Sequence, residues 1–199
     1  MKDIKTYIDE SIFSGSKDVV KSTEDTLQQE AVDELCKYIY DYKRISKYLD
    51  IKLGPKGYEI TNISNLPCVL SELPDLGLKY KISKFYGGSL YLNSIESTDL
   101  TTVFTPDCEF NGSLGISWCG YLNSLKGCPK KVVVFDCSFN KILNSIEGAP
   151  QECKVFRWVD NGVYADVSHA SKKPKKSMEP TEENIRKYLK SKTAHIELT

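Results

Sequence analysis

The chain has 199 residues, in which 27 Lys plus Arg balance 27 Asp plus Glu, and 40% of the residues are hydrophobic. A neutral chain offers no overall field to attract nucleic acid or an anionic membrane surface, and this apolar content is typical of folded globular proteins. No apolar run approaches the ~20 residues of a membrane span, and the mixed charges of the opening residues are unlike a secretion signal. The seven cysteines are therefore expected to be reduced.

Residues 1–25 predict a short amphipathic helix followed by a polar linker. Apolar residues recur every three or four positions, at Met1, Ile4, Ile8 and Ile12. Ser14-Gly15-Ser16 ends this pattern, and the residues that follow are polar and mixed in charge. We expect this segment to be separable from the folded body.

Residues 26–50 predict one long helix. Apolar residues keep helical spacing from Ala31 to Leu49, and no Gly or Pro interrupts them. A turn follows at Leu53-Gly54-Pro55-Lys56-Gly57, after which short β-type runs separated by turn residues dominate.

A repeat of 21 residues occupies the centre of the chain. Leu122–Pro129 reads LNSLKGCP, and 21 residues later Leu143–Pro150 reads LNSIEGAP. Phe135 and Phe156, and likewise Asn140 and Asn161, recur at the same offset. A shorter likeness, LNSIE at residues 92–96, is interpreted as a third copy, and residues 60–74 as a degenerate first coil. Because a unit of this length cannot bury its own apolar residues, residues 58–168 are predicted to stack as a solenoid.

The repeat also sets a register for the strands. Residues 113–116 align with 134–137 and then with 155–158, and a period of two separates inward from outward side chains. The inward residues are Leu114, Ile116, Phe135, Cys137, Phe156 and Trp158, and the outward ones are Gly115, Asp136 and Arg157. The charged outward pair, Asp136 and Arg157, is the candidate partner-binding site.

Residues 169–199 predict a basic linker and a closing helix. Lys172–Lys176 is a charge run typical of a solvated connector, and Val163–Val167 is predicted as an additional edge strand. Thr181 is a good N-cap, and Glu182 and Glu183 follow it where the helix dipole favours negative charge. This helix is predicted to cap the open end of the stack.

The repeat pattern resembles the atypical leucine-rich repeats of tailed bacteriophages and bacteria. The likeness covers about residues 82–162, with departures at Lys154, at Cys119 and after Glu96. It implies an α+β fold, a short leucine-rich-repeat-like β-solenoid flanked by N-terminal and C-terminal helices. In such repeats the Leu and Phe positions fill the core, and the Asn hydrogen-bonds backbone at the bend.

The opening residues resemble the capsid-targeting peptides of internal head proteins of large tailed phages. Those peptides are cut after a Leu or Ile, any residue and Glu, which Ile8-Asp9-Glu10 matches, with Ser11 after the cut. The resemblance implies packaging inside the virion. The alternative is a plain amphipathic helix packed on the body.

No motif for catalysis, a metal or a cofactor is recognised. Cys119, Cys128 and Cys137 are spaced nine apart, but two of them align with apolar or small residues of other copies, which favours a core role. His169 and His195 lie in polar segments away from any candidate nucleophile. We therefore expect no catalytic residues, no metal ligands and no cofactor.

The sequence leads to the hypothesis of a non-enzymatic, phage-type protein that binds another protein, either a phage scaffold or a host protein. It would act in the host cytoplasm or inside the virion, without nucleic acid or membrane as partner. A host-directed effector or inhibitor of a bacterial protein, and a small enzyme without a recognisable motif, stay as alternatives. The sequence does not indicate the oligomeric state.

Overall fold

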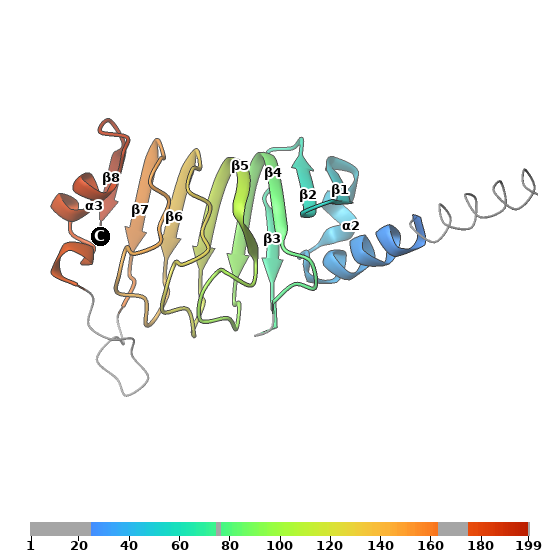
Figure 1. The fold of residues 1–199 in the computed structure, drawn as a ribbon, viewed down its shortest axis with the longest axis horizontal. Coiled ribbons are helices and arrows are strands. Elements are labelled where there is room, and N and C mark those ends of the chain that lie inside the picture. Colours follow the sequence, from blue (N-terminus) through green and yellow to red (C-terminus); the bar gives the residue numbers. More distant parts are fainter. Residues whose placement is uncertain (1–24, 75–76, 163–174, 199) are drawn as a thin grey trace, which may run out of the picture.

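The computed structural model describes residues 25–74, 77–162 and 175–198. A single, mainly parallel sheet runs along the longest axis of the molecule, with helices at both ends (Figure 1). The predictions for residues 1–24, the capsid-targeting helix included, and for an edge strand at 163–167 lie outside the described residues, as does His169.

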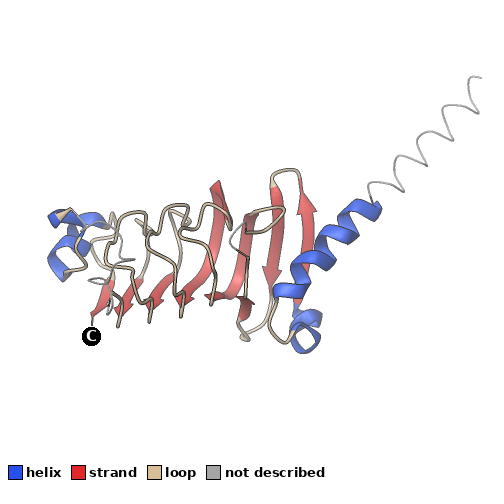
Figure 2. Cartoon of the chain, turned by 90° about the horizontal axis from the view of Figure 1, so that it is seen from below, coloured by secondary structure: helices blue, strands red, loops and turns tan. Residues whose placement is uncertain are grey.

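Five strands form the body of the sheet, β4 (Ile82–Asn93), β5 (Phe104–Ser117), β6 (Val134–Ser138), β7 (Val155–Val159) and β8 (His195–Leu198). Each pairs in parallel with the next. Loops that connect successive strands form the opposite wall, as Figure 2 shows. The chain thus winds as a β-solenoid of about four turns, and the predicted fold class is confirmed.

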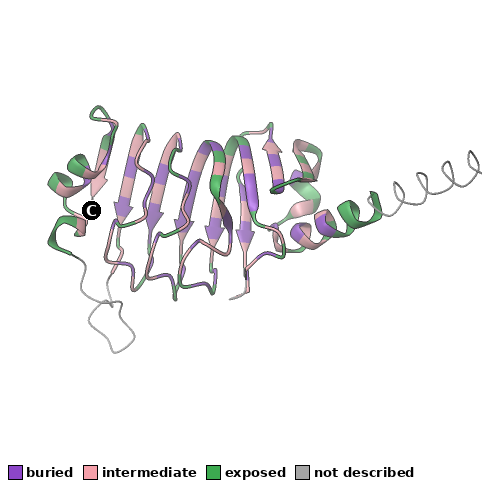
Figure 3. Ribbon diagram, viewed as in Figure 1, coloured by how far each residue is buried: buried purple, intermediate pink, exposed green. Residues whose placement is uncertain are grey.

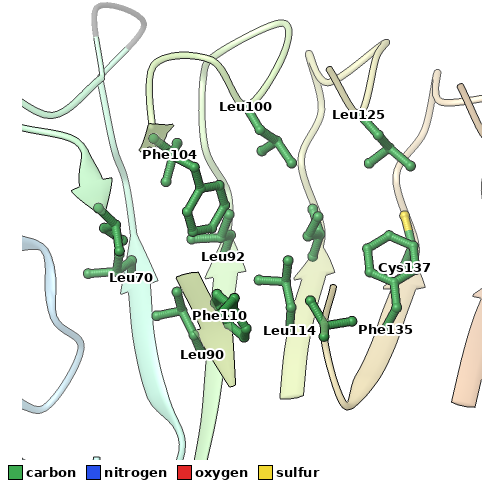
Figure 4. Close-up of a cluster of buried hydrophobic side chains, with 14 of the residues drawn as sticks. Leu70, Leu90, Leu92, Leu100, Phe104, Phe110, Leu114, Leu125, Phe135 and Cys137 are labelled. Carbon is green, nitrogen blue, oxygen red and sulfur yellow. The ribbon is translucent and has the colours of Figure 1, made fainter. Parts of the chain in front are cut away.

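The predicted register is also confirmed. Leu114 pairs with Phe135, which pairs with Phe156. In the same way, Ile116 pairs with Cys137, which pairs with Trp158. The inward residues of these strands are buried, and burial alternates along β7, whereas outward Gly115 of β5 and Ser138 of β6 are buried as well (Figure 3). Loop residues such as Leu100 and Leu125 meet them from the other wall (Figure 4). The core is therefore a stack of aligned apolar rows.

The first coil is split between two strands. β2 (Gly57–Asn62) pairs with the first half of β4, and β3 (Cys68–Ser71) pairs with its second half. A hairpin joins β2 to β1 (Leu49–Gly54), the antiparallel edge strand, through the predicted turn. Ile60 and Leu73 of this coil are buried, whereas Ile63 is exposed.

The prediction of a third copy of the repeat at residues 92–96 is wrong. Leu92 lies inside β4 and pairs with Ile116 of β5, whereas Leu122 and Leu143 lie in the loops after their strands. Five matching residues are too few to fix a register when each strand allows several apolar positions. The residues that do pair, Leu92 and Ile116, are 24 positions apart, so this coil is three residues longer than the 21-residue repeat.

The single long helix predicted for residues 26–50 is also divided. Helical residues 25–38 are followed by a break, then by α2 (Tyr42–Ile45) and the 3₁₀ helix η1 (Ser46–Tyr48). The break arises because the Tyr40 amide donates to the Val69 carbonyl, 2.8 Å away, and because Asp41 adopts left-handed backbone with φ of 53°. Pairing with β3 therefore replaces less than one turn of helix, at residues 39–41.

Helices cover both ends of the apolar stack. At the first end Ala31, Leu35 and Ile39 are buried, and the Tyr58 hydroxyl donates to the Ala31 carbonyl at 2.8 Å. At the other end lie η2 (Lys176–Met178) and α3 (Glu182–Tyr188), whose Ile185 is fully buried. Thr181 caps α3 as predicted, since its hydroxyl accepts from the Asn184 amide at 3.2 Å.

Candidate functional site

The outer face of the sheet carries a mixture of polar, charged, aromatic and β-branched side chains. The central outward row is formed by Val69, Tyr91, Gly115, Asp136, Arg157 and Glu197, one from each successive strand. A Cβ atom at Gly115 would collide with the Tyr91 ring, so this ring lies across β5. The rows beside it carry Ser113, Ser117 and Ser138. We call this surface the outer face.

Asp136 and Arg157, the predicted site residues, lie side by side on the outer face. Their nearest charged atoms, Arg157 Nη1 and Asp136 Oδ2, are 3.7 Å apart. Arg157 Nε also donates to Glu197 Oε2 at 2.5 Å, and His195 Nε2 lies 3.3 Å from the other oxygen of Glu197. This network gives the β6–β8 end of the outer face one positive and two negative side chains, with the His195 ring beside them.

The network tunes the protonation of its members. Hydrogen bonding from Arg157 lowers the pKa of Glu197 below its usual range, and the same bond raises the pKa of Arg157. Both groups therefore stay charged throughout the neutral range. Because such exposed pairs contribute little to stability, the network is available for contact with a partner.

A column of unusual backbone conformations borders the outer face where the strands end. Ser94, Trp118, Phe139 and Asp160, each the first residue after a strand, have φ between 49° and 59°. Left-handed backbone is uncommon for residues other than Gly, Asn and Asp, and it is unfavourable for bulky side chains. The solenoid requires this corner conformation in each coil, but it does not require aromatic residues there, as Ser94 and Asp160 demonstrate.

Trp118 and Phe139 form an exposed aromatic pair at this corner. Their rings stack with centroids 4.8 Å apart and planes inclined by 10°. Trp118 remains 61% exposed and Phe139 38% exposed. Large apolar surfaces left in water on a rigid frame are typical of binding sites. We call these two side chains the aromatic pair.

Asparagines beneath the corner make it rigid. Asn140 is fully buried; its side chain accepts from the Cys119 amide at 3.1 Å and donates to the Ile116 carbonyl at 3.0 Å. Asn161 repeats the arrangement one coil later, where its side chain donates to the Cys137 carbonyl at 2.7 Å. These bonds satisfy backbone groups at each bend, as the repeat resemblance implied. They hold the backbone that carries the aromatic pair.

The cysteines lie in an environment that suppresses thiol chemistry. Burial raises the pKa of Cys68 to about 12 and that of Cys119 to about 11, and it raises the pKa of Cys137 well above its usual range. Because the thiolate is the reactive form and the metal ligand, these groups are poorly suited to either role. In the described ranges, no group of three or more His, Cys, Asp and Glu side chains could hold a metal ion.

The sequence led to one part of this site and missed the other. Asp136 and Arg157 follow directly from the 21-residue register, whereas Glu197 pairs with Arg157 from a distant segment. The aromatic pair was missed, although Trp118 and Phe139 also stand 21 residues apart, directly after aligned strands. The predicted cleavage site, Ile8 to Ser11, lies outside the described residues.

These features define a β-solenoid repeat protein with an exposed sheet face and an aromatic corner. Comparison with protein-family models, with curated proteins and with solved structures finds no match to this chain. None of the helices that the structure describes is long and apolar enough to cross a membrane.

Proposed function

We propose that this protein is a non-enzymatic binding protein that recognises another protein through its outer face and aromatic pair. The observation that carries the proposal is the exposed stacking of Trp118 on Phe139, on backbone that disfavours bulky residues. Trp, Tyr and Phe are enriched at protein interfaces, and a few such anchors carry most of the binding energy.

The surroundings of the aromatic pair favour a protein as the partner. Tyr91 adds a third ring on the adjoining face, where it lies over Gly115 between Ser113 and Ser117. Arg157, Asp136 and Glu197 supply charges of both signs at one end of that face. An apolar centre with a charged border is the usual anatomy of a protein interface.

The proposal is tested by removing the aromatic pair without disturbing the frame. The double variant Trp118→Ser/Phe139→Ser is expected to weaken a captured partner by about tenfold or more, because each ring is an anchor of the kind that costs over 1 kcal/mol when truncated. Quantitative pull-down followed by titration of the purified partner measures the loss. Asp136→Ala/Arg157→Ala should weaken the same complex less.

Tyr40→Ser is the matched control, because Tyr40 is 68% exposed but belongs to the helical end of the molecule. It should bind like the unmodified protein, and circular dichroism should show that all variants keep their fold. Equal capture by the double variant and by the control would refute the proposal.

The sequence also suggests a biological setting for this protein. We propose that the protein is a phage component packaged in the virion after cleavage behind Glu10, and that its partner is then a scaffold protein. The residues Ile8-Asp9-Glu10-Ser11 support this. Mass spectrometry of virions should find a mature chain that begins at Ser11. A chain in particles that retains Met1, or no chain in particles, would instead favour the alternative of an effector directed at a host protein.

A further inference from the structure

A cavity of about 470 Å³ lies away from the aromatic corner, where the turns between coils meet the amino ends of the strands. Four successive coils and the end of α3 contribute to its wall. The lining residues that concern its chemistry are Lys81, Phe104, Lys126, Lys130, Ala149 and Tyr188. This volume is within the range of sites for small organic molecules. We call it the lysine cavity.

The lysine cavity is lined by cations and by no carboxylate. Lys81, Lys126 and Lys130 are all exposed, and no Asp or Glu is among its lining residues. The neighbouring cavity of about 550 Å³ differs, since it combines Lys130 and Lys131 with Asp107 and Glu109. The charged side chains that line the lysine cavity are therefore all positive, as they also are in a smaller cavity of about 300 Å³ lined by Lys56, Lys79 and Lys81.

The three lysines also lack the ion pairs that other lysines of this region make. Lys56 pairs with Asp107, and both Lys131 and Lys190 pair with Glu152. Within the part of the chain that the structure describes, none of Lys81, Lys126 and Lys130 lies within 4.0 Å of a carboxylate oxygen. Three lysines without a carboxylate partner around the lysine cavity favour an anionic ligand.

The remaining wall is uncharged and combines apolar side chains with the neutral polar side chains of Thr101, Gln151 and Tyr188. Phe104 and Ala149 are buried, and the Tyr188 hydroxyl donates to the Ala149 carbonyl at 2.8 Å. Burial raises the pKa of the Cys128 thiol well above its usual range and also raises the pKa of Tyr188, so both stay neutral near pH 7. A ligand would therefore meet positive charge at the rim and apolar surface behind it.

We propose that the lysine cavity binds a small organic phosphate, with its phosphate between Lys81, Lys126 and Lys130 and its apolar body against the wall near Phe104 and Ala149. A phosphate monoester carries nearly two negative charges at neutral pH and so matches three lysines better than a single carboxylate does. This site is separate from the outer face, and the two proposals stand or fall independently.

Phenyl phosphate is the probe, compared with phenol, which has the body without the charge, and with inorganic phosphate, which has the charge without the body. Titration calorimetry on the full chain should show phenyl phosphate binding several-fold more tightly than inorganic phosphate, and phenol not binding. Added salt should weaken the binding, because the lysines are exposed. Amide signals of Gly127 and Gly148, which line the cavity, should shift in NMR spectra.

The double variant Lys126→Gln/Lys130→Gln should lose about tenfold or more in affinity for phenyl phosphate. Lys37→Gln/Lys43→Gln removes the same charge from exposed lysines in the helical segments at the other end of the molecule, and should keep the affinity within about twofold. The proposal is overturned if both variants lose affinity equally, if the cavity variant binds normally, or if phenyl phosphate does not bind at millimolar concentration.

Discussion

Replacing Phe135 by alanine is expected to lower the free energy of unfolding by about 3 to 5 kcal/mol. Phe135 is fully buried in an inward row, between Leu114 and Phe156, and its ring centroid lies 5.1 Å from that of Phe156. Its removal would leave a cavity shared by three coils, which stacked neighbours cannot fill without losing their pairing. Urea unfolding monitored by circular dichroism measures the change.

Val134→Ala is the matched control for this variant. Val134 is the preceding residue on the same strand, but it points outward and is half-buried. Its truncation should cost no more than about 1 kcal/mol, the span of strand propensities. If the two variants are destabilised equally, Phe135 does not belong to the core and the stacked-row architecture is wrong. Since domains are stable by only about 5 to 15 kcal/mol, the Phe135 variant is expected to be near its stability limit.

Gly148→Ala is expected to destabilise the protein by about 2 to 5 kcal/mol. Gly148 turns the chain with φ of 88°, which costs a residue with a side chain about 1 to 2 kcal/mol. A Cβ atom there would also lie 2.6 Å from the carbonyl carbon of Leu125 in the preceding coil, and such overpacking costs about 1 to 3 kcal/mol. Thermal and urea unfolding both measure the effect.

Gly120→Ala provides the comparison, because no atom lies within 4 Å of the position that its Cβ would take. Gly120 also lacks the positive φ of the turn glycines. The alanine should leave stability within about 1 kcal/mol of the unmodified protein. A Gly148 variant as stable as the Gly120 variant would show that the coils are not in backbone contact at this turn.

The sequence was sufficient where a physical constraint repeats. The 21-residue offset fixed which residues of β5, β6 and β7 face inward, because a parallel sheet keeps equivalent side chains in line. The turn between residues 53 and 57 and the Thr181 cap followed from local chemistry. These predictions needed no knowledge of distant contacts.

The sequence failed where a distant contact decides the outcome. The helix predicted for residues 26–50 breaks at Asp41 because Tyr40 pairs with Val69, a partner that helical periodicity cannot reveal. β8 joins the sheet beside β7 from a segment almost 40 residues later, and it brings Glu197 to Arg157. The aromatic pair was hidden because no rule of core packing applies to exposed residues.

The register of β6 against β7 allows related chains to gain additional coils by duplication. Successive coils meet through the same asparagine bonds and the same glycine contacts, at an offset of 21 residues. A duplicated segment of that length would make the same asparagine hydrogen bonds and glycine contacts with the coil on each side, and the helical ends would stay unchanged. Descendants of this chain can therefore lengthen by whole coils, each adding about 4.8 Å to the sheet.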